Sequence, residues 1–532
     1  MPERIVILSG KVGSGKTTLS NQLARSFNLT LLKTRNFLRK RAEGVPSERK
    51  ALQAFGERLD RRTHGEWVRE DIQHAADELP GNAIIVVDAV RILAQVNAIR
   101  KAYGRRVFHV HLEASDEELV ERYRKRASDE IKELRSYAAV QRNKTERNVP
   151  LLARVADVVI RTDRCTPLDV LVRVASHLNL YGRVYSRAVD VLIGGQYGSE
   201  GKGQVAAFLA PEYDLLVRVG GPNAGHKVYE EPKPYAFHTL PSGTRVCEAK
   251  ILIGAGAVVN VDTIMKEIAE CHVPQDRLVV DPQVMIIEKQ DIEAEQQLRA
   301  RIGSTAQGVG KATARRIMRQ EDVRLARDIE QLKPFIKPGR EVFDEMFRNG
   351  KRILLEGTQG TGLSIYHGLY PHVTSRDTSV AGCLAEAGIS ARRVRKVIMV
   401  CRTYPIRVQN PSKGTSGSMT SEISWEEIAR RSGYSVSELR EAEKTTTTGL
   451  QRRVAEFDWN LLRIGASINA PTDIALTFVD YISKSNANAR RFEQLTPDTI
   501  RFIEEVEKVA SCPVSLISTR FHTRSIIDRR MW

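Results

Sequence analysis

Residues 10–17 form a glycine-rich loop whose groups could hold and polarise a triphosphate. They read GKVGSGKT and fit the pattern G-x-x-x-x-G-K-[ST]. The glycines let backbone N–H groups curl round phosphate oxygens, Lys16 would reach the β- and γ-phosphates, and the Thr17 hydroxyl would ligate Mg²⁺. The predicted ATP site comprises Gly10, Gly13, Ser14, Gly15, Lys16, Thr17, Thr18 and Asp88.

The segments around this loop have the order that a phosphate-binding loop requires. A β-branched run at 4–9 predicts a strand before the loop, and residues 19–27 predict a helix after it. A second apolar run, 83–88, ends in Asp88, where a Walker-B or substrate-orienting carboxylate would stand. This agreement disfavours a chance glycine turn.

Alternating strands and helices predict a parallel α/β domain over about 180 residues. Apolar runs at 106–112 and 157–160 supply two of its strands. The basic run at 119–126 lies where small kinases carry a lid, and a solvated helix face explains it equally well. This domain resembles the nucleoside monophosphate kinase and dephospho-CoA kinase group of P-loop proteins, which implies ATP binding without identifying the phosphate acceptor.

A second strand and glycine loop begin at residue 189. Residues 189–193 (VDVLI) precede residues 194–203 (GGQYGSEGKG), whose spacing differs from that of the first loop. The second loop resembles the GQWGDEGKGK segment of adenylosuccinate synthetases. Further segments resemble that family in the same order over about 340 residues, namely 220–226 (GGPNAGH), 302–310 (IGSTAQGVG), 356–360 (EGTQG), 370–375 (YPHVTS), 446–449 (TTTG) and 476–480 (LTFVD).

The resemblance implies a reaction. Enzymes of that family phosphorylate the 6-oxo group of a purine nucleotide and then displace the phosphate with the amine of aspartate. By resemblance, Lys202 holds triphosphate oxygens, the Gly225 carbonyl ligates Mg²⁺, and His226 stabilises or protonates the phosphoryl–oxygen bridge. The implied catalytic residues are Ser199, Lys202, His226 and Gln359.

The same resemblance implies binding residues for three substrates. The nucleoside monophosphate site would comprise Asn223, Thr305, Arg319, Gln359 and Thr374. The aspartate site would comprise Thr447, Thr448 and Arg452. The triphosphate site would comprise Gly201, Lys202, Gly203, Gly225, His226, Asp480, Ser518 and Thr519. Because Arg319 aligns with an arginine that reaches the neighbouring subunit's nucleotide site, a homodimer is implied.

One departure from the family bears on the substrate. Ser199 stands where the family has the aspartate that takes the proton from ring nitrogen 1 and ligates Mg²⁺. A serine hydroxyl is a poor base near neutral pH, so either the enzyme is inactive or its substrate has changed. Guanine carries a 2-amino group beside ring nitrogen 1, and serine leaves room for it. Phage-type relatives that act on dGMP have the same replacement, so we expect dGMP as the acceptor, with IMP as the alternative.

Other departures concern the sugar and the energy donor. Leu450 stands where the family has an arginine at the ribose hydroxyl edge, which fits a 2′-deoxy substrate or a degenerated aspartate loop. Asp480 matches a carboxylate that reads guanine, but Phe478 replaces a lysine and Lys227 a threonine. The implied donor is GTP, with ATP as the alternative.

Composition limits the remaining possibilities. A chain of 532 residues predicts at least two domains, here α/β domains at 1–182 and 183–532. Six scattered cysteines without a CxxC pair indicate reduced thiols in a cytoplasmic protein, and no apolar run is long enough for a membrane span. The net charge of +17 is spread along the chain, which favours small phosphorylated anions over nucleic acid as partners. A bifunctional ligase and kinase is the leading hypothesis, against a non-catalytic nucleotide sensor.

Overall fold

The computed structural model describes residues 2–42, 49–125, 137, 138, 142, 144–181, 187–444, 449–522 and 524–532. The chain divides into two compact units, Met1–Tyr181 and Gly182–Trp532. Each unit carries its own mainly parallel sheet. Among the described helices, none is both long enough and apolar enough to cross a membrane.

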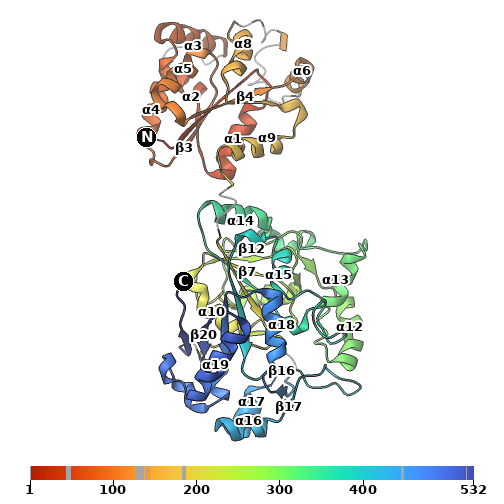
Figure 1. The fold of residues 1–532 in the computed structure, drawn as a ribbon. Coiled ribbons are helices and arrows are strands. Elements are labelled where there is room, and N and C mark those ends of the chain that lie inside the picture. The colour runs from red at the N-terminus through yellow and green to blue at the C-terminus, as the bar shows by residue number, and fades with distance from the viewer. Residues whose placement is uncertain are drawn as a thin grey trace. The chain divides into compact units, whose positions relative to one another are not determined.

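The first unit is a five-stranded parallel sheet with helices on both faces (Figure 1). The strands lie in the order β2-β3-β1-β4-β5. Their bounds are β1 Arg4–Gly10, β2 Thr30–Lys33, β3 Ile84–Asp88, β4 Val107–Glu113 and β5 Val158–Arg161. The helices are α1 Lys16–Phe27, α2 Thr34–Arg41, α3 Arg49–Thr63, α4 Glu66–Asp77, α5 Leu93–Tyr103, α6 Asp116–Arg124, α8 Lys144–Asn148 and α9 Pro167–His177.

Alternate residues of β1 pack against opposite helix layers. Ile5 and Ile7 belong to the core formed with α4 and α5, whereas Val6 and Leu8 belong to the core formed with α1 and α9. A strand covered on both faces needs apolar side chains at every position, which explains the unbroken apolar run. The glycine loop that follows β1 therefore emerges at the carboxyl edge of a fully buried strand.

The second unit is built on a nine-stranded sheet in the order β12-β10-β7-β14-β6-β15-β19-β20-β21, in which β21 alone is antiparallel to its neighbour. The bounds are β6 Val189–Gly194, β7 Leu215–Arg218, β10 Lys250–Ile253, β12 Leu278–Val280, β14 Ile353–Glu356, β15 Val394–Arg402, β19 Asp473–Thr477, β20 Val514–Ser518 and β21 Ile526–Asp528. Short strands outside this sheet are β8 His226–Val228, β9 Tyr235–Phe237, β11 Val258–Val259, β13 Met285–Ile286, β16 Ile406–Arg407, β17 Glu422–Ile423 and β18 Arg453–Ala455.

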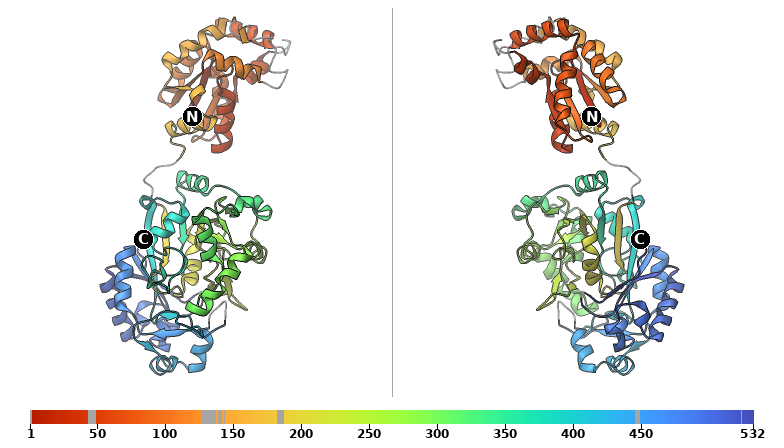
Figure 2. Two further views of the ribbon diagram at one scale, coloured as in Figure 1. Left: turned by 90° about the vertical axis from the view of Figure 1, so that its right-hand side faces the viewer. Right: turned by 90° about the vertical axis from the view of Figure 1, so that its left-hand side faces the viewer.

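Helices cover both faces of the large sheet. They are α10 Lys202–Leu209, α11 Val261–Glu270, α12 Lys289–Ile302, α13 Val309–Ile317, α14 Gly339–Arg348, α15 Val380–Ala387, α16 Trp425–Ser432, α17 Val436–Ala442, α18 Trp459–Asn469 and α19 Pro497–Ala510. Val191 and Ile193 of β6 pack in the core that includes α14, α15, α18 and α19, whereas Leu192 packs with α10. Within this unit, Figure 2 shows α12 and α13 (green) on the side opposite α19 (dark blue).

The parallel strands bring their last residues to one edge of the large sheet. β6, β7, β14, β15 and β19 end in Gly194, Arg218, Glu356, Arg402 and Thr477. In open parallel sheets, ligands bind outside the carboxyl ends of the strands. The loops that follow these five residues therefore form the region where a site is expected.

Candidate active site

The loop after β6 is held by a buried carboxylate at its centre. Glu200 accepts hydrogen bonds from the backbone N–H groups of Gln196 at 3.0 Å and Gly198 at 2.8 Å. Its other oxygen lies 2.5 Å from Nζ of Lys202, and both side chains are about 1% exposed. Gly201 starts helix α10 at φ 84°, a left-handed conformation that favours glycine. Lys202 thus stands at the first turn of a helix, where an anion is electrostatically favoured.

Ser199 lies at the tip of the same loop. Its carbonyl accepts a hydrogen bond from Arg402 at 3.2 Å, while its hydroxyl has no hydrogen-bond partner among the described residues. Arg402 also donates to Glu443 at 2.7 Å in a fully buried ion pair, and Glu443 accepts from Arg452 at 3.1 Å. The Ser199 backbone is therefore tied to the residues on either side of the expected aspartate loop.

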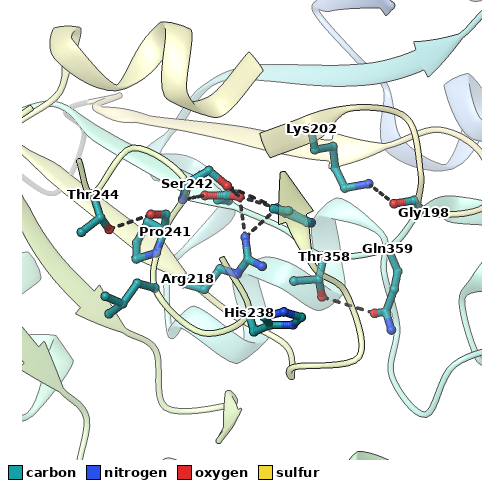
Figure 3. A network of polar contacts seen from close by, with 12 residues as sticks. Gly198, Lys202, Arg218, His238, Pro241, Ser242, Thr244, Thr358 and Gln359 are labelled. Atoms are coloured by element: carbon teal, nitrogen blue, oxygen red, sulfur yellow. Dashed lines mark hydrogen bonds and ion pairs between the residues drawn. The ribbon is translucent and has the colours of Figure 1, made fainter. Parts of the chain in front are cut away.

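His226 takes part in a buried polar network with Arg218, Ser242 and Glu356. Figure 3 shows Arg218 and Ser242 of this network. Its Nδ1 lies 2.5 Å from Oε1 of Glu356, and Arg218 donates to the same carboxylate. Ser242 donates to Glu356 through its hydroxyl at 2.6 Å and its N–H at 2.8 Å. Nε2 of His226 is buried and has no hydrogen-bond partner in the described part of the chain. Nη2 of Arg218 is also buried without a partner in this part of the chain, so the network leaves two nitrogens that could meet a ligand.

Charges in this network set the protonation states of the empty site. Burial and the nearby Arg218 lower the pKa of His226 to about 3. Burial alone would raise the pKa of Glu356, but Arg218, His226 and Ser242 outweigh it and bring that pKa to about 2. Glu356 is therefore ionised and His226 neutral at neutral pH in this site.

A cavity of about 670 Å³ opens above these loops. Many of the residues that the sequence predicted for the nucleoside monophosphate and aspartate line it. They are Asn223, Thr305, Gln359, Thr374 and Arg452. The cavity is also lined by Ser199, predicted as catalytic, by Gly225, predicted for the triphosphate and Mg²⁺, and by Leu450. The cavity thus brings together residues from six separate segments of the chain.

Two hydrogen bonds orient side chains in this cavity. The Gln359 amide donates to the Thr374 hydroxyl at 2.8 Å, and the Thr305 hydroxyl donates to Asn223 at 3.1 Å. Gln359 itself has a φ of 62°, which turns the backbone sharply after β14. The amide and hydroxyl groups provide neutral donors and acceptors suited to a phosphate or a base edge.

The predicted donor-base residues lie apart from that cavity. Oδ2 of Asp480 accepts a hydrogen bond from the Tyr434 hydroxyl at 3.0 Å, while Oδ1 is buried without a partner among the described atoms. Burial raises the pKa of Asp480 to about 7. Phe478 lies beneath Arg402, whose guanidinium carbon is 4.0 Å from the ring centroid. Ser518 and Thr519, at the end of β20, are both buried.

Some predicted residues are not brought into the cavity of the second unit. Gly201, Lys202, Gly203 and His226 lie at the adjacent β6 loop and network, outside the residues that line it. Arg319 is exposed just beyond α13, with a φ of 52°. Thr447 and Thr448 lie outside the described residues.

The glycine loop of the first unit has the expected groups in contact. Lys16 donates to the carbonyls of Gly10 at 2.7 Å and Lys11 at 2.9 Å. The Thr17 hydroxyl donates to Asp88 at 3.1 Å. A hydroxyl beside a carboxylate is the pair of oxygen ligands that P-loop proteins offer to Mg²⁺.

A cavity of about 300 Å³ adjoins this loop. Gly13, Gly15 and Thr18 line one side, and Arg122 and Pro167 contribute to the rest. Arg122 donates to the hydroxyl of Thr162 at 2.8 Å and to its carbonyl at 2.9 Å. Within the basic run at 119–126, Arg122 therefore faces the nucleotide cavity. The segment 126–136, where a lid would continue, lies outside the described residues.

The second unit offers a weaker set of ligands to Mg²⁺. Gly225 and Ser199 both line the cavity. The oxygen ligands these two residues can offer, carbonyls and a hydroxyl, carry no charge. No group of three or more His, Cys, Asp or Glu side chains in the described ranges could hold a metal ion. Any Mg²⁺ here would depend on the oxygens of a bound triphosphate for its charge balance.

Sequence reasoning missed the partners of the predicted residues. Glu356, Arg218 and Ser242 support His226, while Arg402 and Glu443 support Ser199. Three of these five are charged residues at the last position of a buried strand, namely Arg218, Glu356 and Arg402. A charged residue at the end of an apolar run is the sequence signal that could have identified these three residues.

Comparison with known proteins gives two family matches. The adenylosuccinate synthetase family matches residues 191–328 and 324–487, and an AAA domain family matches residues 6–147. The adenylosuccinate synthetase of Pyrococcus horikoshii is 35% identical over 348 residues, which cover 64% of this chain and 98% of that protein. The enzyme of Methanocaldococcus jannaschii is 36% identical over 349 residues, covering 64% of this chain and 96% of that protein.

Two solved structures resemble the second unit. Adenylosuccinate synthetase from Plasmodium falciparum matches with a TM-score of 0.56 and 20% identity, covering 65% of this chain and all of that one. The succinoaminodeoxyadenylate synthetase of cyanophage S-2L, solved with dGMP and with dATP as an energy donor, matches with a TM-score of 0.55 and 25% identity. It covers 65% of this chain and 96% of that one.

Proposed function

The chain belongs to the adenylosuccinate synthetase family, with a P-loop kinase-like domain before the ligase domain, and from this we propose that it joins aspartate to the 6-position of dGMP. The product would be the 2-amino analogue of deoxyadenylosuccinate. The observation that carries the proposal is Ser199, which lines the cavity in place of the family's aspartate.

Ser199 favours guanine for a steric and an electrostatic reason. The 2-amino group of guanine lies beside ring nitrogen 1, where a longer carboxylate would be crowded. The Ser199 hydroxyl is free of partners among the described residues, so it can accept a hydrogen bond from that amino group. The cyanophage structure supports this choice, because that protein shares 25% identity with this chain and is bound to dGMP.

The chemistry has two steps that the site residues support. In the first step, the 6-oxygen attacks the γ-phosphorus and the nucleoside diphosphate leaves, with Lys202 facing the transferred group. In the second, the amine of aspartate attacks carbon 6 and phosphate leaves. Because His226 is hydrogen-bonded to Glu356 through Nδ1, its Nε2 can carry a proton to the bridging oxygen once an anion is bound. Mg²⁺ would supply further charge neutralisation when bound.

The proton of ring nitrogen 1 needs another acceptor in this site. Glu200, the nearest carboxylate in sequence, is buried and occupied by Lys202 and two backbone N–H groups. We therefore assign proton removal to water beside the Ser199 hydroxyl. Serine is a weaker base than the family's aspartate, but its smaller side chain accommodates the 2-amino group.

Leu450 supports a 2′-deoxy sugar. It lines the cavity with nearly half of its surface exposed, where the family has an arginine at the ribose edge. A site without that donor loses nothing when the 2′-hydroxyl is absent.

For the energy donor, the geometry of Asp480 supports an adenine nucleotide. Guanine offers two adjacent donors, N1–H and the 2-amino group, and would occupy both carboxylate oxygens. Tyr434 donates one hydrogen bond to Oδ2, while Oδ1 is buried without a partner among the described atoms. We therefore assign Oδ1 to the 6-amino group of adenine, and the cyanophage protein was solved with dATP as its donor.

We also propose that the first unit phosphorylates a nucleotide in the same pathway. Lys16, Thr17 and Asp88 support ATP binding and phosphoryl transfer. A purine deoxynucleoside monophosphate must be phosphorylated twice before a polymerase can use it. A kinase fused to the ligase would catalyse one of these later phosphorylations.

A homodimer completes the proposal. Arg319 is exposed, and the two residues before it, Ile317 and Met318, are 68% and 72% exposed. An arginine beside exposed apolar side chains is typical of a protein interface. In the dimer, Arg319 would reach the partner's nucleoside monophosphate.

One assay separates the candidate functions. Purified protein is incubated with aspartate, ATP or GTP, and either dGMP or IMP, and phosphate release and the succinyl product are followed by mass spectrometry. The proposal requires product from dGMP. Product from IMP alone indicates an ordinary adenylosuccinate synthetase, and binding without product indicates a nucleotide sensor.

A further inference from the structure

A buried ion pair lies behind the cavity of the second unit. Arg376 follows the segment 370–375, and Glu386 lies near the end of α15. Nε of Arg376 donates to Oε1 of Glu386 at 2.6 Å, and the two side chains are 8% and 18% exposed. Neither residue lines the cavity, so neither contacts a ligand bound there directly.

The pair connects three loops of the site. Oε2 of Glu386 accepts a hydrogen bond from the N–H of Gly220 at 3.0 Å, at the start of the segment 220–226. Arg376 donates to the Thr358 hydroxyl at 2.9 Å and to the Thr358 carbonyl at 3.3 Å. Arg376 itself anchors the loop that carries Thr374. One ion pair thus joins the loops that carry the predicted nucleotide contacts.

The packing at this junction leaves little freedom. A Cβ on Gly220 would lie 2.2 Å from the Thr358 hydroxyl oxygen and 3.2 Å from Nη1 of Arg376. Gly220 also has a φ of 85°, which disfavours any other residue. The backbone of one loop therefore rests directly on the side chains of the other two.

The contacts continue from the ion pair into the cavity. The Thr358 hydroxyl donates to Oε1 of Gln359 at 3.3 Å, and Nε2 of Gln359 donates to Thr374 at 2.8 Å. This order fixes which end of the Gln359 amide is the donor on the side of Thr374. An amide whose orientation is fixed in advance binds its ligand with a smaller loss of entropy.

We propose that Arg376 is a positioning residue for the nucleoside monophosphate, acting through Thr358 and Gln359 on one side and through Glu386 and Gly220 on the other. The inference rests on the proposed ligase function but does not depend on which purine is the acceptor. Arg376 acts at a distance from the ligand, and its effect is on the affinity for one substrate.

The test compares three variants of the full-length protein. Arg376→Met should raise KM for the monophosphate about tenfold or more, the scale expected when a positioned contact is displaced. KM for the substrate aspartate should change less than about twofold, because the residues expected to bind aspartate are held in place by other contacts. Thr358→Val removes the hydroxyl that links Arg376 to Gln359, keeps the ion pair, and should raise the same KM in the same direction.

Arg395→Met is the matched control. Arg395 forms an ion pair with buried Asp190. The two residues lie near the starts of β15 and β6, whereas the site lies beyond the carboxyl ends of these strands. Arg395→Met should lower the melting temperature without changing KM for the monophosphate. If Arg376→Met behaves like this control, or if Thr358→Val leaves that KM unchanged, the positioning role is wrong.

Calorimetric measurement of dGMP and IMP binding separates a failure of the proposed acceptor from a failure of the positioning role of Arg376. A protein that prefers IMP contradicts the assigned acceptor, while the weakened binding of IMP to Arg376→Met would still support the positioning role. Equal affinity of wild type and Arg376→Met for both nucleotides overturns that role whatever the preferred purine.

Discussion

Nδ1 of His226 lies 2.5 Å from Oε1 of Glu356 and 2.7 Å from Nη1 of Arg218, so both charged partners meet the same ring nitrogen. Nε2, the other ring nitrogen, is buried without a partner among the described residues and is the one left for the substrate in the proposed reaction. In the proposed mechanism, the network around Glu356 therefore belongs to the catalytic apparatus together with His226.

Glu356→Gln tests this assignment. Glutamine keeps the shape and can still accept from Ser242, but it removes the charge that holds the imidazole in one protonation state. We expect kcat to fall about 100-fold or more, on the scale of general acid–base catalysis, with small changes in every KM. Steady-state kinetics beside a melting curve makes the measurement. An unchanged kcat in a folded variant would contradict the role of the pair.

Lys16→Ala tests the independence of the two units. The substitution removes the charge that faces the transferred phosphoryl group in the first unit, so phosphoryl transfer there should be lost. Ligation should remain, because Lys202 serves the second unit with its own loop. Lys202→Ala is the reciprocal variant and should show the opposite pattern. Loss of both activities in either folded variant would mean that the units are catalytically coupled.

The pH dependence of stability follows from a buried serine between two histidines. The Ser9 hydroxyl lies 2.7 Å from Nε2 of His109 and 2.7 Å from Nδ1 of His111. Burial lowers the pKa of both histidines to about 4, with Arg100 adding to the effect on His109 and Lys16 to that on His111. In the unfolded chain both histidines take up a proton below about pH 6.5, whereas in the folded chain they do so only below about pH 4.

Stability should therefore be lost as pH falls from about 6.5 towards 4, by up to about 1.4 kcal/mol per pH unit for each histidine. Urea denaturation at pH 7 and pH 5 measures the difference. The variant His109→Gln/His111→Asn keeps hydrogen-bonding groups near Ser9 and removes the titration, so its loss between these pH values should be smaller. Equal losses in the two proteins would exclude the histidines as the cause.

Arg319→Ala tests assembly. If Arg319 completes the partner's site, the variant should have a KM for the monophosphate raised by about tenfold, on the scale of a lost charged contact, and unchanged affinity for the triphosphate. Mixing it with Lys202→Ala should recover activity, because one site of the mixed dimer then has both residues. A monomeric protein that is fully active would contradict the shared site.

The local parts of the candidate site could be predicted from the sequence, because short spacings encode them. The loops at 10–17 and 194–203 each contain their glycines, lysine and neighbouring helix within a few residues, and both occupy the carboxyl edge of a parallel sheet. Asn223, Thr305 and Thr374 likewise belong to short motifs, and the fold brings them to one cavity.

Long-range pairs could not be predicted in this way. His226 and Glu356 are 130 residues apart, and Arg402 and Ser199 are 203 residues apart, so only the order of strands in the sheet brings them together. The ion pair of Arg376 and Glu386 depends on how α15 packs beneath the loops, which no local pattern records. The hydrogen bond from Tyr434 to Asp480, 46 residues away, could not be predicted for the same reason.

In the proposed reaction, Ser199 sets the preference for dGMP over IMP. The direct measurement is kcat/KM for dGMP, GMP, IMP and dIMP in wild type, Ser199→Asp and Leu450→Arg. Wild type should prefer dGMP, and Ser199→Asp should shift the preference towards IMP by about 1–3 kcal/mol, the size of a single pocket contact. Leu450→Arg is the control and should favour ribonucleotides without changing the preferred base. A wild type that uses IMP best, or a Ser199→Asp variant with unchanged base preference, would contradict the account.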